Sequence, residues 1–325
     1  MTTNNPIVIP DHSDLVHGAT TCIKDKGYPC RENIAYLLPD HNEEDARLDK
    51  QHHLVKLVFG GSFDSPVKDA LEQGITVLDS GCGTGSFACE LGKEYPNSKI
   101  HGIDISLRVP EAIRPPNCEF HVHNIIHDPI FPDNHFDFIH QRLLTLALSS
   151  SDWKRVCIPK LLLQINILNH RMYKKVVATL MRQLKPGGWI ELAETVISPC
   201  ENGGPRMNLL LDGIAEYSRK TKNIDFGIAM KLDSLLRDAG AINISTHKVF
   251  LPFNHSGEVG RLTWDNFKIA ADGMKPWIIK IRPELEDPKS YEKFIEECAE
   301  ECKENKTGVY TIRCYGQKPS TTSGN

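Results

Sequence analysis

The chain has 325 residues, of which 40% are hydrophobic, and a formal net charge of −4. This length and apolar content suffice for one large α/β domain with a full core. The negative net charge gives no electrostatic footprint for nucleic acid, so the composition argues against a nucleic-acid surface. No stretch of about 18 apolar residues is present, so no transmembrane helix is predicted.

The N-terminal segment and the cysteines indicate an intracellular location. Residues 1–11 have no basic region followed by an apolar stretch, and so do not resemble a signal peptide. The ten cysteines are scattered without a C-x-x-C pair, and Cys298 and Cys302, at helical spacing, lack a His/Cys partner cluster. We therefore predict no metal site, reduced thiols and a cytoplasmic or nuclear location. Residues 1–30 are polar and are predicted to be flexible.

The first predicted helix covers residues 40–59. Asp40 is a candidate N-cap for this helix. The residues that recur at helical spacing on one face are Leu48, His52, Val55 and Phe59.

Residues 75–91 predict a strand, a tight glycine turn and a helix. The apolar run from Ile75 ends at Asp79, three glycines follow at alternate positions, and Phe87 begins a helical pattern. Without Cβ atoms such a backbone lets a nucleotide-like ligand approach closely. The helix N-terminus then presents N–H groups to that ligand.

The glycine spacing separates the two cofactor classes that use such a turn. A dinucleotide fold has G-x-G-x-x-G, and its third glycine would fall at Ser86. The pattern here is D-x-G-x-G-x-G, which resembles motif I of the class I S-adenosylmethionine (SAM) methyltransferases. The resemblance implies SAM as the cofactor, and an ordinary β–α turn is the alternative. The implied contacts in this segment are Asp79, Gly81, Cys82, Gly83 and Gly85.

Two later strand ends carry further candidate contacts. The next strand ends in Asp104, about 20 residues beyond the turn, where a carboxylate can accept both hydroxyls of a ribose. Ile105 follows it in the predicted site. In the resembling family, Asn124 would meet the adenine amino group and Ile125 would pack on the ring. A helix cap for Asp104 and a turn role for Asn124 are the alternatives.

Longer matches resemble one branch of this family, the fungal methyltransferases that include regulators of secondary metabolism. The segments that carry this resemblance are 36–40, 43–49, 51–52, 59–61, P-D-N-x-F-D-F-x-H-Q-R at 132–142 and L-K-P-G-G at 184–188. It extends from about Tyr36 to Pro319 and implies a doubly wound, seven-stranded, mostly parallel, Rossmann-like sheet with an N-terminal helical lid over the SAM pocket. Arg47, Gln51 and His52 of that helix are candidates to face the ligand, with ordinary solvated positions as the alternative.

A single methyltransferase domain is predicted over residues 31–317. It comprises the lid helix at 40–59, a SAM-binding core at 75–194 and substrate-side elements at 200–317. In the substrate-side part, patterning predicts helices at 206–219, 230–239, 262–281 and 291–303 and strands at 242–251 and 308–316. In the family's topology the last strand is inserted antiparallel beside the fifth. Residues 318–325 are predicted to be a disordered tail.

One stretch, about residues 156–174, interrupts the family pattern. Excising it joins Trp153-Lys154-Arg155 to Val176 and restores that pattern, and the stretch is rich in Ile, Leu, Asn and Lys. We hypothesise that it is a translated intron, and a real helical insertion near the pocket mouth is the alternative. A transcript that retains the stretch would exclude the intron.

The resemblance leaves the catalytic residue open. Methyl transfer is an in-line displacement at a carbon that the sulfonium already activates, and a general base is needed only for a protonated acceptor. His140, placed after the fourth strand and also among the cofactor contacts, and Glu194, at the end of the fifth, are candidates. A structural histidine and a solvated carboxylate are the alternatives. Core packing is expected for three aromatic residues that could otherwise line an acceptor pocket: Trp264, Trp277 and Tyr217.

Three functions are consistent with these residues. The first is a SAM-dependent methyltransferase that acts on a small molecule or a protein. The second is a SAM-binding regulatory protein of a gene-regulatory complex with little activity, which the branch resemblance suggests. The third is an NAD(P)-dependent oxidoreductase, which Ser86 disfavours. A methyl acceptor is the expected partner, with neither nucleic acid nor membrane.

Overall fold

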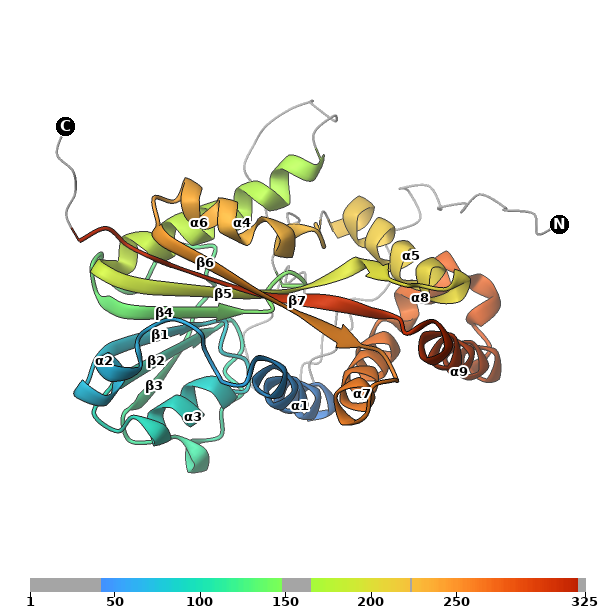
Figure 1. The fold of residues 1–325 in the computed structure, drawn as a ribbon, viewed down its shortest axis with the longest axis horizontal. Helices are drawn as coiled ribbons and strands as arrows, with labels where there is room; N and C mark the ends of the chain where they lie inside the picture. Colours follow the sequence, from blue (N-terminus) through green and yellow to red (C-terminus); the bar gives the residue numbers. More distant parts are fainter. Residues whose placement is uncertain (1–41, 148–164, 223, 321–325) are drawn as a thin grey trace, which may run out of the picture.

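The computed structural model describes residues 42–147, 165–222 and 224–320. These residues form a seven-stranded sheet in the order β3-β2-β1-β4-β5-β7-β6, with helices on both faces (Figure 1). The strands are β1 (Thr76–Ser80), β2 (Lys99–Asp104), β3 (Cys118–Val122), β4 (Phe136–Arg142), β5 (Leu184–Glu201), β6 (Ile242–Pro252) and β7 (Gly308–Gln317). Pairs among β1 to β5 are parallel, and β7 is antiparallel to β5 and β6. The predicted fold class and the place of the last strand are confirmed.

Alternating side chains of the central strands attach helices to both faces of the sheet. The helices in the described residues are α1 (Asn42–Phe59), α2 (Lys68–Gln73), α3 (Ser86–Glu94), α4 (Ile165–Gln183), α5 (Pro205–Lys222), α6 (Leu232–Asp238), α7 (Glu258–Gly273), α8 (Lys275–Ile281) and α9 (Pro288–Asn305). In β1, Val77 packs in the core with α2 and α3, whereas Leu78 packs in the core with α4 and α6. This period-two alternation produces a sheet covered on both sides. None of these helices has the length and hydropathy of a membrane span.

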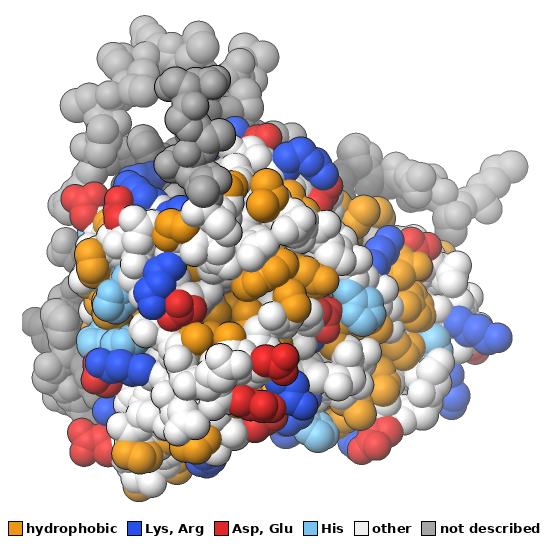
Figure 2. Space-filling model, turned by 60° about the vertical axis from the view of Figure 1, so that its left-hand side comes forward, with side chains coloured by type: hydrophobic (Ala, Val, Ile, Leu, Met, Phe, Trp, Pro, Cys, Tyr) orange, Lys and Arg blue, Asp and Glu red, His pale blue; other side chains and the backbone are white. Residues whose placement is uncertain are grey.

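A third core lies beyond the carboxyl ends of the central strands. Residues from α5, α7, α8 and α9 pack there around Leu251 of β6 and Val309 of β7. Figure 1 shows these helices together at one end of the sheet, beside α1. Charged side chains of both signs are interspersed on the molecular face in Figure 2, without a basic stripe.

Three predicted boundaries are wrong. The helix expected over 262–281 is two helices, because Pro276 in the first turn of α8 has no N–H to continue an α7 ladder. The fifth strand does not end at Glu194, since its pairing with β7 extends to Glu201. The disordered tail does not begin at Lys318, whose backbone N–H bonds to Gly188 and whose ammonium donates to the carbonyls of Arg182 and Leu184.

Two other predictions fall partly or wholly on residues outside the description. The flexible segment 1–30 lies wholly outside it. Of the proposed insertion at 156–174, the structure describes α4 from Ile165, with the Met172 and Tyr173 side chains buried in the core. The end of the insertion is therefore a packed helix, which agrees with a helical insertion, and the intron stays a hypothesis.

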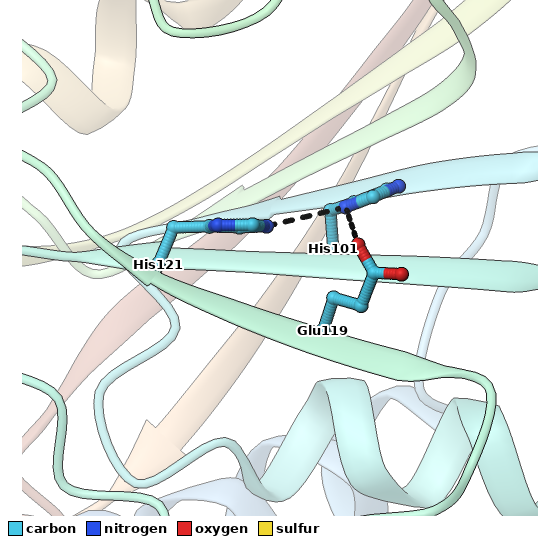
Figure 3. A group of neighbouring side chains, drawn as sticks. All are labelled: His101, Glu119 and His121. Atoms are coloured by element: carbon cyan, nitrogen blue, oxygen red, sulfur yellow. Dashed lines mark hydrogen bonds and ion pairs between the residues drawn. The ribbon is translucent and has the colours of Figure 1, made fainter.

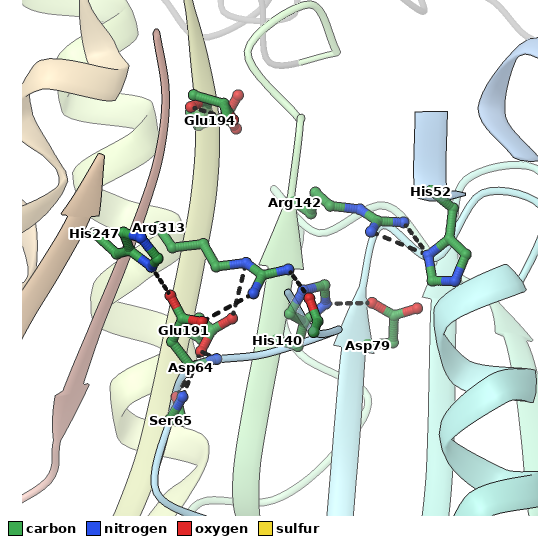
Figure 4. Close-up of polar contacts among 12 residues, drawn as sticks. His52, Asp64, Ser65, Asp79, His140, Arg142, Glu191, Glu194, His247 and Arg313 are labelled. Carbon is green, nitrogen blue, oxygen red and sulfur yellow. Dashed lines mark hydrogen bonds and ion pairs between the residues drawn. The ribbon is translucent and has the colours of Figure 1, made fainter. Parts of the chain in front are cut away.

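A buried arginine joins the segment after α1 to the sheet. Arg313 of β7 is 1% exposed and donates to a carboxylate oxygen of Asp64 at 3.1 Å and to the carbonyl of Gly61 at 2.8 Å. Its Nε lies 3.6 Å from Glu191 of β5 (Figure 4). Glu191 in turn accepts from the backbone N–H groups of Asp64 and Ser65 at 2.8 Å each. The loop that follows α1 is thus held by charge and hydrogen bonds, in addition to the packing of Phe63 against the core.

We expect Arg313→Met to lower the free energy of unfolding by about 3–5 kcal/mol, because Glu191 would keep a buried charge without its cation. Urea unfolding of the full chain measures this. Arg261→Met is the matched control, since Arg261 is exposed and pairs with Asp265 on the surface of α7, where a loss below about 0.5 kcal/mol is expected. Equal losses for the two variants would contradict the prediction.

Candidate functional site

A cavity of about 480 Å³ opens at the carboxyl ends of β1, β2 and β4. Ligands bind at this edge of open parallel sheets. Seven of the ten predicted cofactor residues line it: Gly81, Cys82, Gly83, Asp104, Ile105, Asn124 and Ile125. The other three, Asp79, Gly85 and His140, lie behind the wall and do not line the cavity.

The glycine turn is shaped by backbone geometry that other residues rarely adopt. Gly81, Gly83 and Gly85 have φ of +76°, +54° and +76°. A Cβ on Gly81 would lie 2.6 Å from the Leu144 side chain, and one on Gly85 would lie 2.6 Å from Val109. A Cβ on Gly83 would meet only Leu48, at 3.6 Å. The outer two glycines therefore permit close packing, whereas Gly83 presents bare backbone to the cavity.

Asp104 is the last residue of β2, as predicted, whereas Asn124 lies two residues beyond the end of β3, and each holds local backbone. Asp104 accepts from the N–H of Gly83 and of Ser106, both at 2.9 Å. Burial raises the pKa of its carboxyl, and these two bonds oppose the rise. Asn124 accepts from the N–H of Ile126 at 3.2 Å, which is the turn role weighed as its alternative. Both residues nevertheless line the cavity, and each carboxylate oxygen of Asp104 retains acceptor capacity.

Helix α1 forms one wall of the cavity. Its wall residues are Arg47, Leu48, Gln51, Leu54 and Val55. Asp49 accepts hydrogen bonds from the hydroxyls of Thr84 and Ser86, at 2.7 and 2.5 Å, which ties the helix to the glycine turn. The prediction that Arg47 and Gln51 face the site agrees with this wall, but His52 lies outside it.

Asp79 and His140 form a buried pair between β1 and β4. Asp79 Oδ1 lies 3.0 Å from His140 Nδ1, and the ring stacks on Phe87 with centroids 3.7 Å apart. Burial lowers the pKa of His140, so the neutral ring donates from Nδ1. The position predicted for His140 is wrong: the residue lies within β4, not after it, and is 1% exposed. This burial agrees with the structural histidine weighed as the alternative.

Arg142, two residues further on, was not predicted and does line the cavity. Both terminal nitrogens of its guanidinium donate to Nδ1 of His52, at 3.2 and 3.1 Å (Figure 4). Because arginine can only donate, Nδ1 of His52 is the acceptor, and Nε2 carries the proton that meets Glu90 at 3.1 Å. That bond, with others from Ser62 and Lys56, lowers the pKa of Glu90 to about 2, against the effect of burial.

Of the two catalytic candidates, Glu194 is the one that reaches the cavity wall. Its carboxylate accepts from the N–H of Leu144 at 2.8 Å, the hydroxyl of Thr145 at 2.8 Å and the hydroxyl of Tyr173 at 2.9 Å. Burial raises its pKa to about 7. Glu194 is therefore buried, which excludes the solvated carboxylate weighed as its alternative. The strand end predicted for it is wrong, because β5 continues to Glu201. It holds the loop that follows β4 against β5.

A large apolar part of the cavity wall comes from the C-terminal part of the chain. These residues include Ile197, Leu211, Ile214, Phe226, Leu251, Phe253, Phe267, Ala270, Met274 and Val309. Sequence analysis missed them, because they lie on five helices and strands and on the segments between these, and only the fold brings them together. Trp264, Trp277 and Tyr217 are absent from the wall, and Trp264 packs against Phe253 and Phe267, as expected for core residues.

Comparison with known proteins identifies relatives of this sequence. A family model described as a methyltransferase domain matches residues 23–246. An N-methyltransferase, verN, of Clonostachys rogersoniana is 27% identical over 65% of this chain and 66% of its own length. The secondary metabolism regulator LAE1 of Cochliobolus heterostrophus is 28% identical over 71% of each chain. The methyltransferase pytC of Aspergillus terreus is 33% identical over 50% of this chain and 42% of its own.

We expect Glu194 to make the stability of the protein depend on pH. Because its folded-state pKa of about 7 lies above the ordinary value of 4.5, the folded protein keeps a proton that the unfolded chain has lost. Its contribution to the free energy of unfolding is fully present below about pH 4.5 and is lost as the pH rises to about 7, by up to about 3 kcal/mol. Urea unfolding of the wild type and Glu194→Gln between these pH values measures the difference, and parallel curves would contradict the assignment.

Proposed function

The chain belongs to the methyltransferase domain family, and we propose that it transfers the methyl group of S-adenosylmethionine to a small, largely apolar acceptor. One observation carries the proposal: a single cavity joins the glycine turn to a chamber with apolar walls. Its volume of about 480 Å³ lies within the range of about 300–1,000 Å³ typical of small-molecule sites. When bound, SAM supplies an electrophilic methyl group on a sulfonium.

The polar half of the cavity fits the nucleoside. Gly83 presents bare backbone, Asp104 offers carboxylate oxygens for ribose hydroxyls, and Asn124 with Ile125 offers an amide and an apolar surface for a base. The Cys82 thiol also lies in this wall, and burial raises its pKa well above the usual value, so it is a packing group rather than a nucleophile.

The apolar half favours a small acceptor over a protein segment. A peptide backbone entering there would leave polar groups without partners, since the wall offers few. The polar side chains on this side include Glu194, Thr263 and Asn266. An amine is the acceptor class that best fits them. Glu194 can take the proton of the amine at near-neutral pH, and one of the two hydroxyls that it binds, that of Tyr173 or Thr145, then turns to accept the new carboxyl proton. One relative is named an N-methyltransferase.

A bulky substitution in the apolar half of the cavity tests whether SAM and the acceptor bind in different halves. We expect Ala270→Phe on α7 to leave the dissociation constant for SAM within about twofold and to reduce methyl transfer by at least about tenfold, because the added ring fills acceptor space. Isothermal titration with SAM measures the first. Labelled methyl recovered in organic extract, after incubation with metabolites of the source organism, measures the second.

Lys268→Phe is the control, since Lys268 is exposed on the same helix. Label recovered in precipitated protein would contradict a small acceptor. SAM binding without any transferred label would favour the regulatory alternative, which the name of one relative supports.

Within this site we propose that Arg142 binds the carboxylate of the methionine part of SAM. Three arginines line the cavity, and two are paired: Arg47 with Glu44 at 2.7 Å, and Arg108 with Asp45 at 3.0 Å. Within the described residues, the hydrogen bonds of Arg142 go to a neutral imidazole, and no carboxylate lies within ion-pair distance of it. Burial lowers its pKa to about 10, so it remains a cation at neutral pH. A buried cation is stabilised by an anion, and the methionine carboxylate supplies one.

Decarboxylated SAM isolates this contact. We expect the wild type to bind SAM about 10–100-fold more tightly than decarboxylated SAM, since a hydrogen bond between charged groups contributes about 1.5–3 kcal/mol. Arg142→Gln should bind the two ligands within about threefold of each other. Isothermal titration of both ligands into both proteins measures the four dissociation constants that this comparison needs.

Arg108→Gln, a second cavity arginine, is the matched control and should keep the preference for SAM. If it loses the preference and Arg142→Gln keeps it, the assignment is wrong. Failure of the wild type to bind either ligand would instead contradict the SAM site.

A further inference from the structure

We propose that His101, Glu119 and His121 bind a divalent transition-metal ion, with Zn²⁺ as the first candidate. Figure 3 shows the three side chains converging on one point at the sheet edge formed by β2 and β3. The proposal is independent of methyl transfer, because no residue of this group lines the cavity.

The strand register creates this convergence. His101 on β2 pairs directly with Glu119 on β3, and His121 follows Glu119 by two residues on the same face. The opposite face of these strands carries Ile100, Cys118 and Phe120, which pack with α3. The histidine face therefore lies away from α3.

The interatomic distances fit a tetrahedral ion. His101 Nδ1 lies 3.5 Å from His121 Nε2 and 3.5 Å from Glu119 Oε2. Zinc bonds of about 2.0–2.1 Å at tetrahedral angles put neighbouring ligand atoms about 3.3 Å apart. All three ligand atoms lie within 4.8 Å of one another, and the half-exposed Glu119 side chain can close the remaining gap.

The donor set selects the metal. Two imidazoles and one carboxylate suit Zn²⁺, Co²⁺, Ni²⁺ or Cu²⁺ rather than Mg²⁺ or Ca²⁺, which prefer oxygen. The other oxygen of Glu119 bonds to Lys99 at 3.0 Å, so one oxygen remains directed at His101. Three protein ligands leave a fourth position for water. The absence of metal sites predicted from sequence rested on cysteine spacing, which does not detect a cross-strand histidine site.

Metal titration of the full chain tests the site. We expect one equivalent of Zn²⁺ to bind in isothermal titration, and one equivalent of Co²⁺ to give the visible absorption of a tetrahedral complex. His121→Ala should weaken Zn²⁺ binding by at least about 100-fold, more than the 10–100-fold typical of losing an outer-shell partner. Glu119→Gln should weaken it also, whereas Lys99→Gln should tighten it by removing a nearby positive charge.

His53→Ala is the control for adventitious binding, because His53 is exposed on α1. It should retain the wild-type stoichiometry and affinity. Glu119 and His121 are not core residues, so circular dichroism should show both variants folded. The proposal is overturned if the wild type binds no stoichiometric Zn²⁺, or if His121→Ala and Glu119→Gln bind it as the wild type does.

Discussion

The buried guanidinium of Arg313 is the constraint on which the site depends. It lies in the middle of β7. Its central carbon, Cζ, lies 4.2 Å from the ring centroid of Phe59, which is the last residue of α1. Its partners Asp64 and Gly61 belong to the loop that follows, and Glu191 holds the same loop through two backbone N–H groups. A charge inside a sheet costs free energy unless it is paired, so this arrangement fixes where the loop lies. The loop in turn fixes α1, and α1 is a wall of the cavity.

The cavity has two halves, one formed mainly by strand ends and backbone and the other by apolar side chains. The half near the glycine turn is made by strand ends and backbone, and its key contacts join neighbouring strand ends or adjacent residues: Gly83 to Asp104, and Asn124 to Ile126. The other half is made by side chains of helices and strands spread over residues 197–309. A ligand common to a family suits the first half, because backbone geometry tolerates little change. Acceptor choice belongs to the second, where single side chains set the shape.

This division also explains what could be predicted from the sequence. The turn after β1, the position of Asp104 at the end of β2 and the antiparallel place of the last strand follow from local patterns and a family resemblance, and the structure has all three. The ligand roles of these residues stay predictions. The position of His140 was misjudged because β4 continues to Arg142, where it pairs with Ala193 of β5, and no local pattern reveals that partner. The buried hydrogen bonds of Glu194 could not be read from the sequence, because its three donor residues lie 21 to 50 positions away along the chain. The apolar wall could not be predicted either, because its residues are spread over positions 197–309 of the chain.

Hydrogen bonds through His52 of α1 link Arg142 at the cavity wall to Glu90 of α3. Arg142 fixes the tautomer of His52, so Nε2 must donate to Glu90 on α3, and Glu90 also holds Ser62 and Lys56 on the α1 side. An anion at Arg142 would compete with the imidazole for the same guanidinium protons. The position of α1 relative to α3 is therefore linked to what occupies the carboxylate position. Because α1 also contributes Leu54 and Val55 to the cavity wall, the helix that His52 ties to Arg142 and Glu90 is itself part of that wall.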